Sequence, residues 1–434
     1  MLANVSLEEA LDSILSQIMP LPCESVSLLQ AIDRVSFLDL VTTCDLPPWP
    51  QASVDGYAVP GDHLGRQRDY IVRESLQRGD RPGSPLLPGQ AAGVVTGGPL
   101  PDGAGAVVPW EKVSLAGNRV VLPGEIVSGS NIKQRGEDFM AGELLARRGT
   151  RLGPGRIGVL AAMGNKEVPV FRRPRVTILS LGRGVVPCRT LADGGLVWDS
   201  NGPLLASLVY RDGGQVIGVE VSGGEAYAGI GDRLGDRLKE LIPQSDLVLT
   251  IGGAASGTDD QALFALRGIG ARVLFWGMRV KPGSHSGAAV MDSRLVISLP
   301  GNPAACAVAC QLLASPALRA LQGLDPYPRR LSAQCTGSFP KKGGPRRFLR
   351  GYVFYREDSW AVNILPGQKS SMLRSLVEWN ALVELPAGHT PLEAGTPVSV
   401  LLLSPIPLPK GEYDGELKIT PSFFQSPSRL PVSL

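Results

Sequence analysis

Glycine- and proline-rich turns follow three apolar runs between residues 246 and 307, and these turns could bind a phosphate-bearing ligand. The runs are Leu247–Ile251, Val273–Val280 and Leu295–Leu299. Their length and β-branched content are typical of strands buried on both faces of a parallel sheet. The turns are therefore expected at the carboxyl ends of neighbouring strands, where open α/β sheets bind ligands. Bare backbone N–H groups at such turns form anion sites. The glycines concerned are Gly252, Gly253, Gly257, Gly283 and Gly301.

Three aspartates lie beside turns of this kind. Asp55 precedes a Gly-Tyr turn, Asp138 ends a loop that carries Lys133 and Arg135, and Asp260 follows the glycine pair at 252 and 253. Mg²⁺ takes oxygen ligands and usually bridges protein carboxylates to phosphates, so carboxylates near a phosphate pocket suit it. Taken singly, each aspartate is more commonly a turn or helix-cap residue.

Basic residues provide the complementary charge. Lys281 follows a predicted buried strand, so its ammonium group should reach the mouth of the sheet and neutralise a phosphate as a point charge. Lys133 and Arg135 could do the same from another domain or subunit. Arg350, in the segment RRFLRG, could contact an anion or simply be solvated. Ser200-Asn201 can cap the helix that is expected to begin there.

The chain resembles the molybdopterin molybdenumtransferases, the family of MoeA and the gephyrin C-terminal region. Asp45–Val59 (DLPPWPQASVDGYAV) looks like the family signature, and Asn131–Asp138 (NIKQRGED) resembles its second acidic motif. The turns at residues 252–253, 281–283 and 299–303 resemble those of its molybdopterin-binding domain. These motifs occur in register, and the match runs from about residue 5 to about residue 403.

The resemblance implies a reaction and a set of site residues. Family members cleave the phosphoanhydride of adenylylated molybdopterin with Mg²⁺ and insert molybdate into the dithiolene, releasing AMP. The motif positions then make Asp55, Asp138, Asp260 and Lys281 the expected catalytic residues, the three aspartates being the metal ligands. Expected cofactor-binding residues are Gly252, Gly253, Ser256, Gly257, Pro282, Gly283, Ser284, Pro300, Gly301, Asn302, Thr96, Arg135 and Arg350.

The same resemblance implies partners. The family's active site forms between the α/β domain of one subunit and domain two of the other, so a homodimer is expected. A molybdopterin adenylyltransferase and apo-molybdoenzymes are further expected partners. We expect no nucleic-acid partner and no membrane association, because the net charge of +3 is small for 434 residues and no apolar run approaches a membrane span. The first residues show no signal-peptide pattern, which favours a cytoplasmic location.

Departures from the family pattern leave two further hypotheses open. The family usually has Thr-Gly-Asp-Glu after its strand, where this chain has Leu181-Gly-Arg-Gly184, and its Lys-Pro-Gly-Lys-Pro becomes Lys281-Pro-Gly-Ser-His285. These changes favour a catalytically weakened protein that binds or carries molybdopterin. A scaffold for protein contacts is a third hypothesis, supported only by the proline-rich C-terminal stretch. No Ser-His-Asp arrangement or cysteine pair suggests other chemistry, since the three histidines and six cysteines are scattered.

The periodicity predicts the elements that position these residues. A capping box at Ser6–Glu9 begins an amphipathic helix, and strands alternate with helices from Arg175 onward, which indicates a three-layer α/β domain. Short apolar runs between turns predict β units before residue 170 and a small β-barrel near the C-terminus. Together with the family resemblance, which implies an elongated domain one with an inserted domain two and a molybdopterin-binding domain, this gives the expected domains: 1–44 with 140–173 (elongated domain one), 45–139 (inserted β-rich domain two), 174–322 (molybdopterin-binding α/β domain), 330–404 (barrel) and 405–434 (tail).

Overall fold

The computed structural model describes residues 2–61, 68–122, 124, 126–182, 184–188, 190, 194–222, 230–253, 260–356 and 358–403. The chain forms two compact units. The first, here unit 1, comprises Met1–Met19, Pro174–Ala320 and the chain from Asp325 onward, and unit 2 comprises Pro20–Arg173 and Leu321–Leu324. The expected tail at 405–434 and the expected site residues Ser256 and Gly257 lie outside the described residues.

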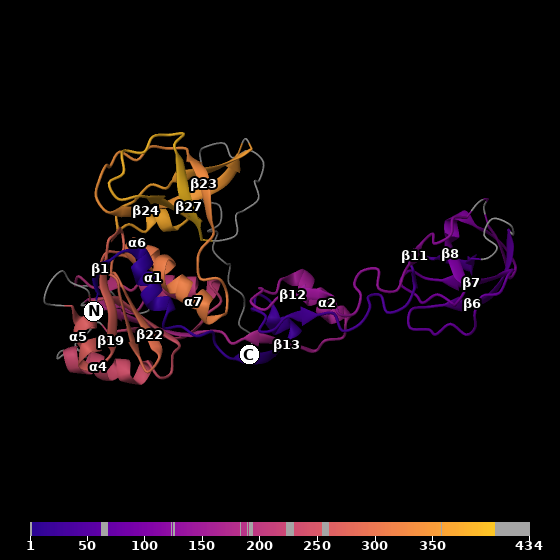
Figure 1. Cartoon of the computed structure of the whole chain (residues 1–434), viewed down its shortest axis with the longest axis horizontal. Helices are drawn as coiled ribbons and strands as arrows, with labels where there is room; N and C mark the ends of the chain where they lie inside the picture. Colours follow the sequence, from indigo (N-terminus) through magenta and orange to yellow (C-terminus); the bar gives the residue numbers. More distant parts are fainter. Residues whose placement is uncertain are drawn as a thin grey trace, which may run out of the picture. The chain divides into compact units, whose positions relative to one another are not determined.

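Unit 1 is built on a seven-stranded sheet (Figure 1). Its middle strands are apolar along almost their whole length because both faces are covered, as the sequence pattern predicts. β14, β18 and β22 pair in parallel, so their carboxyl ends lie at one edge. The strands in spatial order are β1 (Leu2–Val5), β19 (Arg272–Met278), β21 (Gly287–Met291), β22 (Arg294–Leu299), β18 (Leu247–Gly252), β14 (Arg175–Leu181) and β17 (Gln215–Val221).

The three apolar runs were predicted to form neighbouring strands, and this is correct for only two of them. The strands β18 and β22 are adjacent, but β21 lies between β22 and β19 and pairs antiparallel with both. The chain turns back directly after Lys281 and returns as β21, so the run Val273–Val280 is separated from the other two by one strand.

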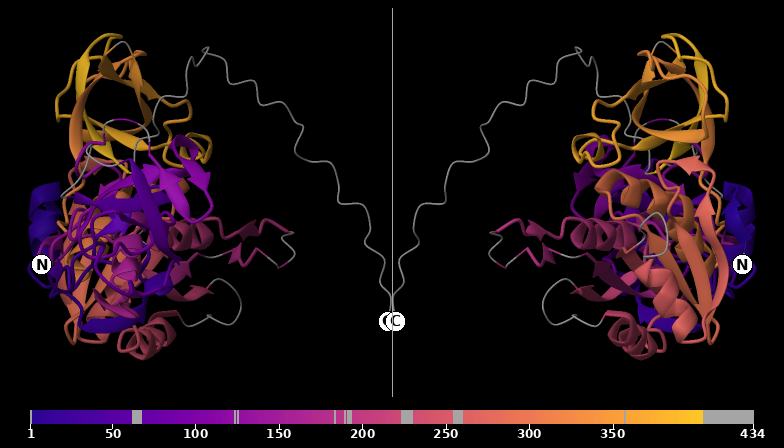
Figure 2. Two further views of the ribbon diagram at one scale, coloured as in Figure 1. Left: turned by 90° about the vertical axis from the view of Figure 1, so that its right-hand side faces the viewer. Right: turned by 90° about the vertical axis from the view of Figure 1, so that its left-hand side faces the viewer.

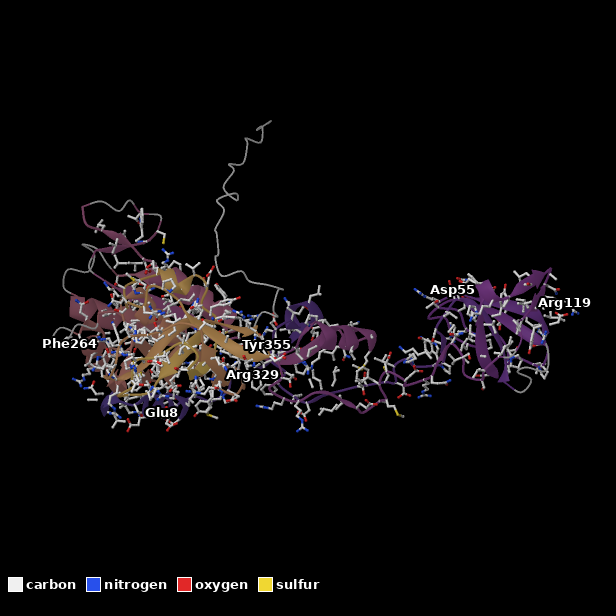
Figure 3. The ribbon with its side chains drawn as sticks, turned by 90° about the horizontal axis from the view of Figure 1, so that it is seen from above. Glu8, Asp55, Arg119, Phe264, Arg329 and Tyr355 are labelled. Carbon is white, nitrogen blue, oxygen red and sulfur yellow. The ribbon has the colours of Figure 1, made fainter. Side chains whose placement is uncertain are left out.

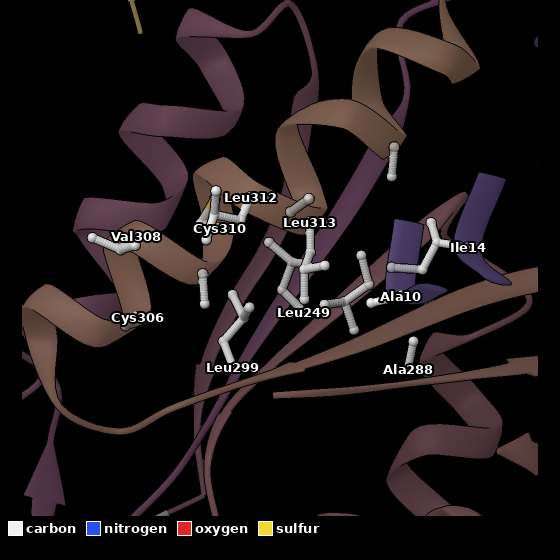
Figure 4. Packing of buried hydrophobic residues seen from close by; sticks show 14 of the residues in the cluster. Ala10, Ile14, Leu249, Ala288, Leu299, Cys306, Val308, Cys310, Leu312 and Leu313 are labelled. Atoms are coloured by element: carbon white, nitrogen blue, oxygen red, sulfur yellow. The ribbon is translucent and has the colours of Figure 1, made fainter. Parts of the chain in front are cut away.

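Helices cover both faces of this sheet, which confirms the three-layer α/β class. One face buries α1 (Leu7–Leu15), α3 (Asn201–Arg211) and the run α6 (Pro303–Ala309), η5 (Cys310–Ala314) and α7 (Ser315–Leu321), packed as in Figure 4. The other face packs against α4 (Ile230–Leu241) and α5 (Gln261–Gly268). The predicted capping box is present: Ser6 Oγ accepts from the Glu9 N–H, and Glu9 accepts from the Ser6 N–H.

The helical run Pro303–Leu321 corrects the expectation that no apolar segment approaches the length of a membrane span. Its 19 residues are long and apolar enough to cross a membrane, which the sequence analysis had not expected of any segment. In the structure 89% of its most apolar window is buried inside the fold. It is apolar all round because it is a core helix, packed between the sheet and its neighbours.

The predicted C-terminal barrel is also confirmed. The strands β24 (Arg346–Arg356), β25 (Ser359–Ile364), β23 (Arg330–Cys335), β27 (Pro397–Leu402) and β26 (Ala381–Leu385) pair in that order. β26 pairs back to β24 and closes the barrel, whose strands curve together in Figure 2. β20 (Val280–Lys281) adds to β24 and connects the α/β part to the barrel within unit 1.

Unit 2 contains a six-stranded sheet and three two-stranded pairs. The sheet runs β8 (Ala104–Pro109), β5 (Gly56–Pro60), β7 (Gln90–Val94), β6 (Asp69–Leu76), β10 (Arg119–Val121) and β9 (Ser114–Ala116). The pairs are β11 (Ile132–Lys133) with β4 (Gln51–Ala52), β12 (Leu144–Ala146) with β3 (Leu40–Val41), and β13 (Glu167–Phe171) with β2 (Cys23–Ser27). The unit also contains the helix α2 (Pro154–Ala162) and the short 3₁₀ helices η1 (Leu28–Ala31) and η3 (Trp110–Lys112).

One expected domain boundary differs from the structure. The first 19 residues were assigned to domain one, whereas they belong to unit 1. The reason is that β1 pairs in parallel with β19 and the apolar stripe of α1 is buried in the unit 1 core. Sequence order alone does not show which sheet a terminal strand joins.

Candidate functional site

In unit 1 the first and third predicted turns meet at the carboxyl edge of the sheet. A Cβ on Gly301 would lie 3.4 Å from the Gly252 Cα, so the two turns are in van der Waals contact. Gly252 also has a φ of 75°, a left-handed conformation that favours glycine. These residues therefore form one narrow wall at the ends of β18 and β22.

A carboxylate that the sequence analysis missed organises this edge. Asp199 is buried, and its Oδ1 accepts from the backbone N–H groups of Asn201 and Gly202, both at 3.0 Å. Its Oδ2 accepts from the Ser180 hydroxyl at 2.8 Å. Ser200, the expected cap of α3, makes no capping hydrogen bond with its side chain. The only available sequence signal was an aspartate two residues before the helix.

The Asn201 side chain ties this cap to the third turn. Its Nδ2 donates to the Gly301 carbonyl at 2.7 Å. The turn after β22 is thereby fixed to the start of α3, and three separate chain segments share one hydrogen-bonded edge. Pro300 and Asn302 lie in the same turn, where Asn302 Nδ2 is 3.4 Å from Ser370 Oγ of the barrel.

The helix starts at this edge are less open to an anion than the sequence suggested. At α6 the N–H of Ala304 donates to the Ser370 carbonyl at 2.9 Å. At α5 the N–H of Leu263 donates to Asp260 Oδ1 at 3.0 Å. Protein groups thus already use these donors, and a ligand would rely on the turns themselves.

Asp260, predicted as a metal ligand, has a structural role in this fold. Besides capping α5, it accepts from the Trp276 indole N–H through Oδ2 at 2.6 Å. Both carboxylate oxygens are therefore engaged, which is the helix-cap role that the sequence analysis left open.

The second turn is held by hydrogen bonds from a neighbouring hydroxyl and a backbone N–H. Ser286 Oγ donates to the Gly283 carbonyl at 2.8 Å, and the Met278 N–H donates to the Ser284 carbonyl at 2.9 Å. A Cβ on Gly283 would lie 3.7 Å from Ala309 Cβ, so this turn packs against α6. Lys281, which precedes Pro282, is exposed.

Arg350 is not a ligand contact, and the prediction that it binds the cofactor is wrong. Its side chain is 0% exposed. Nη2 donates to the Gly367 carbonyl at 2.8 Å, and Nε donates to Ser375 Oγ at 3.0 Å. Burial lowers the pKa of Arg350 to about 10, so the guanidinium is still charged at neutral pH. It fixes the loop that carries Ser370.

In unit 2 the predicted motifs come together. The Ala52 N–H donates to the Gly98 carbonyl and the Ser53 N–H to the Asn131 carbonyl, at 3.0 and 2.9 Å. β4 and β11 add a short antiparallel ladder. The family-like stretch around Asp55, the Thr96 turn and the second acidic motif therefore form one surface.

Asp55 is exposed on this surface (Figure 3). Its Oδ1 accepts from the Thr96 N–H at 2.7 Å and from the Thr96 hydroxyl at 2.8 Å. The backbone hydrogen bond from Thr96 lowers the pKa of Asp55 most, followed by its hydroxyl, with a smaller contribution from the Arg78 charge. Arg78 Nε in turn donates to the Thr96 carbonyl at 2.7 Å, so Arg78 is a further candidate that sequence reasoning missed.

Residues of the second acidic motif form two ion pairs. Asp138 pairs with Lys133 across the short loop. Arg135 Nε donates to Asp45 Oδ2 at 2.5 Å, yet its side chain is 67% exposed and remains reachable by an anion. The motif thus presents alternating charges rather than a purely acidic face.

Two carboxylates on this surface, those of Asp55 and Asp138, could bind Mg²⁺. No group of three or more His, Cys, Asp or Glu among the described residues is arranged to hold a metal ion. Mg²⁺ is commonly bound by one or two carboxylates with phosphates and waters filling the remaining positions. Asp55 uses only Oδ1 in hydrogen bonds within the described part of the chain, so its Oδ2 fits such a role. Asp260 belongs to the other unit.

Replacing Asp199 with alanine is expected to lower the free energy of unfolding by about 1–3 kcal/mol, because two helix N–H groups and a buried hydroxyl lose their acceptor. Urea unfolding measures this. Asp236→Ala, at an exposed position on α4, is the matched control and should change stability by less than about 0.5 kcal/mol. Equal losses in both variants would contradict the capping role.

Comparison with known families covers most of the chain. Residues 5–164 match the MoeA N-terminal region (domain I and II), residues 177–320 a probable molybdopterin binding domain, and residues 332–403 the MoeA C-terminal region (domain IV). The chain belongs to the MoeA family. The resemblance stated from the sequence motifs is therefore confirmed.

Similar proteins and structures agree with this placement. Molybdopterin molybdenumtransferases of Staphylococcus aureus (strain COL) and Staphylococcus epidermidis (strain ATCC 12228) are 26% and 27% identical, each over 92% of this chain and 95% of its relative. Two solved structures of a molybdopterin biosynthesis MoeA protein from Pyrococcus horikoshii are 27% identical and superpose with TM-scores of 0.77 and 0.74. They cover 93% and 92% of this MoeA family member and 100% of their own chains. These relatives support the expected enzyme class, a molybdopterin molybdenumtransferase.

Proposed function

We propose that this chain acts in molybdenum cofactor biosynthesis, by inserting molybdate into adenylylated molybdopterin with release of AMP. The observation that carries the proposal is the Asp55 carboxylate, held by Thr96 beside the second acidic motif. Its environment keeps it charged and leaves one oxygen outward, at a position that matches the family signature. Such chemistry depends on positioning and on electrostatic stabilisation of an oxyanion-rich transition state rather than on a nucleophilic side chain.

Each part of the site has a role in this proposal. Asp55 and Asp138 hold the divalent cation, which when bound offsets phosphate charge and orients the transferred oxyanion. The glycine turns at residues 252–253 and 301 bind the pterin phosphate through backbone N–H groups. Lys281 neutralises negative charge as a point charge. Arg135 and Arg78 are further cations on the surface that carries Asp55.

A second function, a weakly catalytic molybdopterin carrier, is favoured by two observations. Both oxygens of Asp260 are used inside the fold, so one expected metal ligand is already engaged. The turn after β14 carries Gly184 where the family has an acid, while the side chain of Arg183 lies outside the described residues. A carrier would bind the pterin without turnover.

An assay of AMP release from adenylylated molybdopterin, with molybdate and Mg²⁺, distinguishes the two functions. Turnover that requires both ions supports the transferase. Binding of the adenylylated pterin without AMP release supports the carrier. Absence of both binding and turnover would overturn both functions.

We further propose a homodimer, a cytoplasmic location and, as partners, an adenylyltransferase and apo-molybdoenzymes. Each unit by itself holds only part of the expected residue set: the aspartates Asp55 and Asp138 are in unit 2, and the glycine turns and Lys281 are in unit 1. That division is consistent with a site completed between copies, as the family resemblance implies. Sedimentation velocity at micromolar concentration tests the dimer, and a monomer throughout would count against it.

Replacing Thr96 with valine is expected to shift the acidic limb of the pH–activity profile to higher pH. Asp55 has a lowered pKa partly because of the Thr96 hydroxyl, so without that donor the carboxylate protonates at a higher pH. Activity that needs charged Asp55 is present above the pKa of this residue and is lost as the pH falls through that pKa. In the variant the loss should therefore begin at a higher pH. Rates measured from about pH 2.5 to 7 check this, because the pKa of Asp55 lies below its ordinary value. An unchanged acidic limb would show that Asp55 ionisation does not control turnover.

A further inference from the structure

A second concave site lies in unit 1 at the junction of α1, the helical run that follows the PGNP turn, and the barrel. It is a cavity of about 330 Å³, at the lower end of the range for ligand pockets. None of the expected catalytic or cofactor-binding residues lines it. Its floor is apolar and buried, formed by Leu7, Leu11, Leu312 and Leu401.

The cavity is also lined by an amide with an unused donor. Gln311 is 5% exposed, and its Oε1 accepts from Arg211 Nη2 at 2.7 Å. Its Nε2 is buried and has no hydrogen-bond partner among the described residues. The amide orientation is fixed, because an arginine can only donate and Oε1 must face it. A buried amide N–H₂ without an acceptor is costly, so an occupant that supplies a carbonyl oxygen would be stabilised here.

The rim selects the charge of the occupant. Glu8 and Asp12 lie on exposed positions of α1, and the half-exposed Tyr327 also lines the cavity. Glu8 is paired with Arg346 at 2.7 Å, whereas Asp12 has no hydrogen bond or ion pair from its carboxylate within the described ranges. Arg330, the one cation of the rim, is paired with Glu384. The occupant should therefore be apolar, carry backbone carbonyls and be flanked by positive charge.

The chain itself contains a segment with these properties. The sequence continues for 31 residues beyond Leu403 (434 − 403 = 31), and Leu401 lies in the cavity floor. Within Leu417–Pro431 (LKITPSFFQSPSRLP) two adjacent aromatic residues, Phe423 and Phe424, lie between Lys418 and Arg429, and the stretch contains no Asp or Glu.

Tethering makes this occupant favourable. Phe423 follows Leu403 by 20 residues (423 − 403 = 20). A chain of that length reaches at most about 66 Å when fully extended, which is enough to bring Phe423 back to a cavity that contains Leu401. The segment is therefore available to the cavity without any partner.

We propose that this cavity is the docking site of the chain's own Lys418–Arg429 segment, with Phe423 and Phe424 over the leucine floor. Gln311 Nε2 donates to a carbonyl of the segment, and Asp12 faces one of its cations.

Hydrogen–deuterium exchange on the full-length protein tests the proposal. Phe423→Ser/Phe424→Ser should increase exchange at residues 7–15 and 311–316 several-fold relative to the unchanged chain. Tyr413→Ser is the matched control, because Tyr413 is an aromatic residue just before the stretch Leu417–Pro431 and lies between Glu412 and Asp414. It should leave exchange at both regions unchanged. No change in the double variant, or equal changes in both variants, would overturn the proposal.

Binding in trans gives the second measurement. A fluorescent peptide of residues 416–431 should bind the full-length Phe423→Ser/Phe424→Ser protein, and the same peptide with serines at 423 and 424 should bind at least about tenfold more weakly. Adding Asp12→Asn to the protein should weaken binding about two- to fivefold, and less at high salt. Absence of peptide binding would overturn the proposal. Protection of the unchanged chain that increases with protein concentration would identify a second copy as the donor of the segment and overturn docking within one chain.

Discussion

Asp55→Asn is expected to reduce AMP release by about 10²–10³-fold while leaving the fold intact. The substitution keeps the size of the side chain and an oxygen that can accept from Thr96, but it removes the charge. Asp55 is exposed, so no core packing is lost. Under the proposed function this carboxylate holds the cation, and a neutral amide oxygen is a poorer ligand for Mg²⁺. Single-turnover kinetics at saturating Mg²⁺ give the measurement.

Asp102→Asn is the matched control for this variant. Asp102 is an exposed turn residue of the same unit, and the substitution changes the net charge by the same amount. Its turnover should stay within a factor of two or so of the unchanged protein, as expected of a surface substitution away from the site. A wild-type rate in Asp55→Asn would show that Asp55 is not part of the catalytic machinery. An equal loss in both variants would point to net charge rather than to the site.

Mg²⁺ titration separates the two possible origins of a defect. If Asp55 holds the cation, the variant should need a higher Mg²⁺ concentration for half-maximal rate. If the carboxylate only orients the pterin, the Mg²⁺ dependence should stay constant while the rate falls. The first outcome supports the proposed role and the second assigns Asp55 a positioning role.

The sequence predicted the layers of unit 1 well because periodicity reports burial. The alternation expected from Arg175 onward begins there with β14, and α3 begins at Asn201, where a helix was expected to start. These strands are apolar because helices cover both faces. The capping box at Ser6 was readable for a similar reason, since it involves residues only three apart.

Long-range pairing was beyond the reach of the sequence pattern. Nothing in the run Val273–Val280 shows that β21 separates it from β22, because an antiparallel return has the same apolar signal. The pairing of β1 with β19 joins residues about 270 positions apart. Asp199 was missed because its partners, Ser180 and two helix N–H groups, are brought together only by the fold.

The altered turn after β14 illustrates the same limit. The family has acids at the positions of Arg183 and Gly184, so restoring them would require Arg183→Asp and Gly184→Glu. Gly184 has a φ of 74°, however, so a glutamate there is strained whatever the space around it. Arg183→Asp alone is the cleaner variant, since the glycine conformation is kept.

Arg350→Met is expected to lower the free energy of unfolding by about 3–5 kcal/mol, the largest stability effect among the substitutions considered. The side chain is fully buried, so methionine keeps much of the volume but leaves the Gly367 and Lys369 carbonyls without their donor. The loop they belong to caps α6 through the Ser370 carbonyl, so the loss should spread to the turn at Asn302. Pterin binding should weaken as a consequence of this loosening, even though Arg350 contacts no ligand. Urea unfolding together with hydrogen exchange at residues 300–309 measures both effects.

Arg356→Met, at the exposed end of the same strand, is the control, with an expected change below about 0.5 kcal/mol. If Arg350→Met kept wild-type stability but lost pterin binding, the arginine would be a ligand contact after all, and its assignment as the anchor of this loop would be wrong.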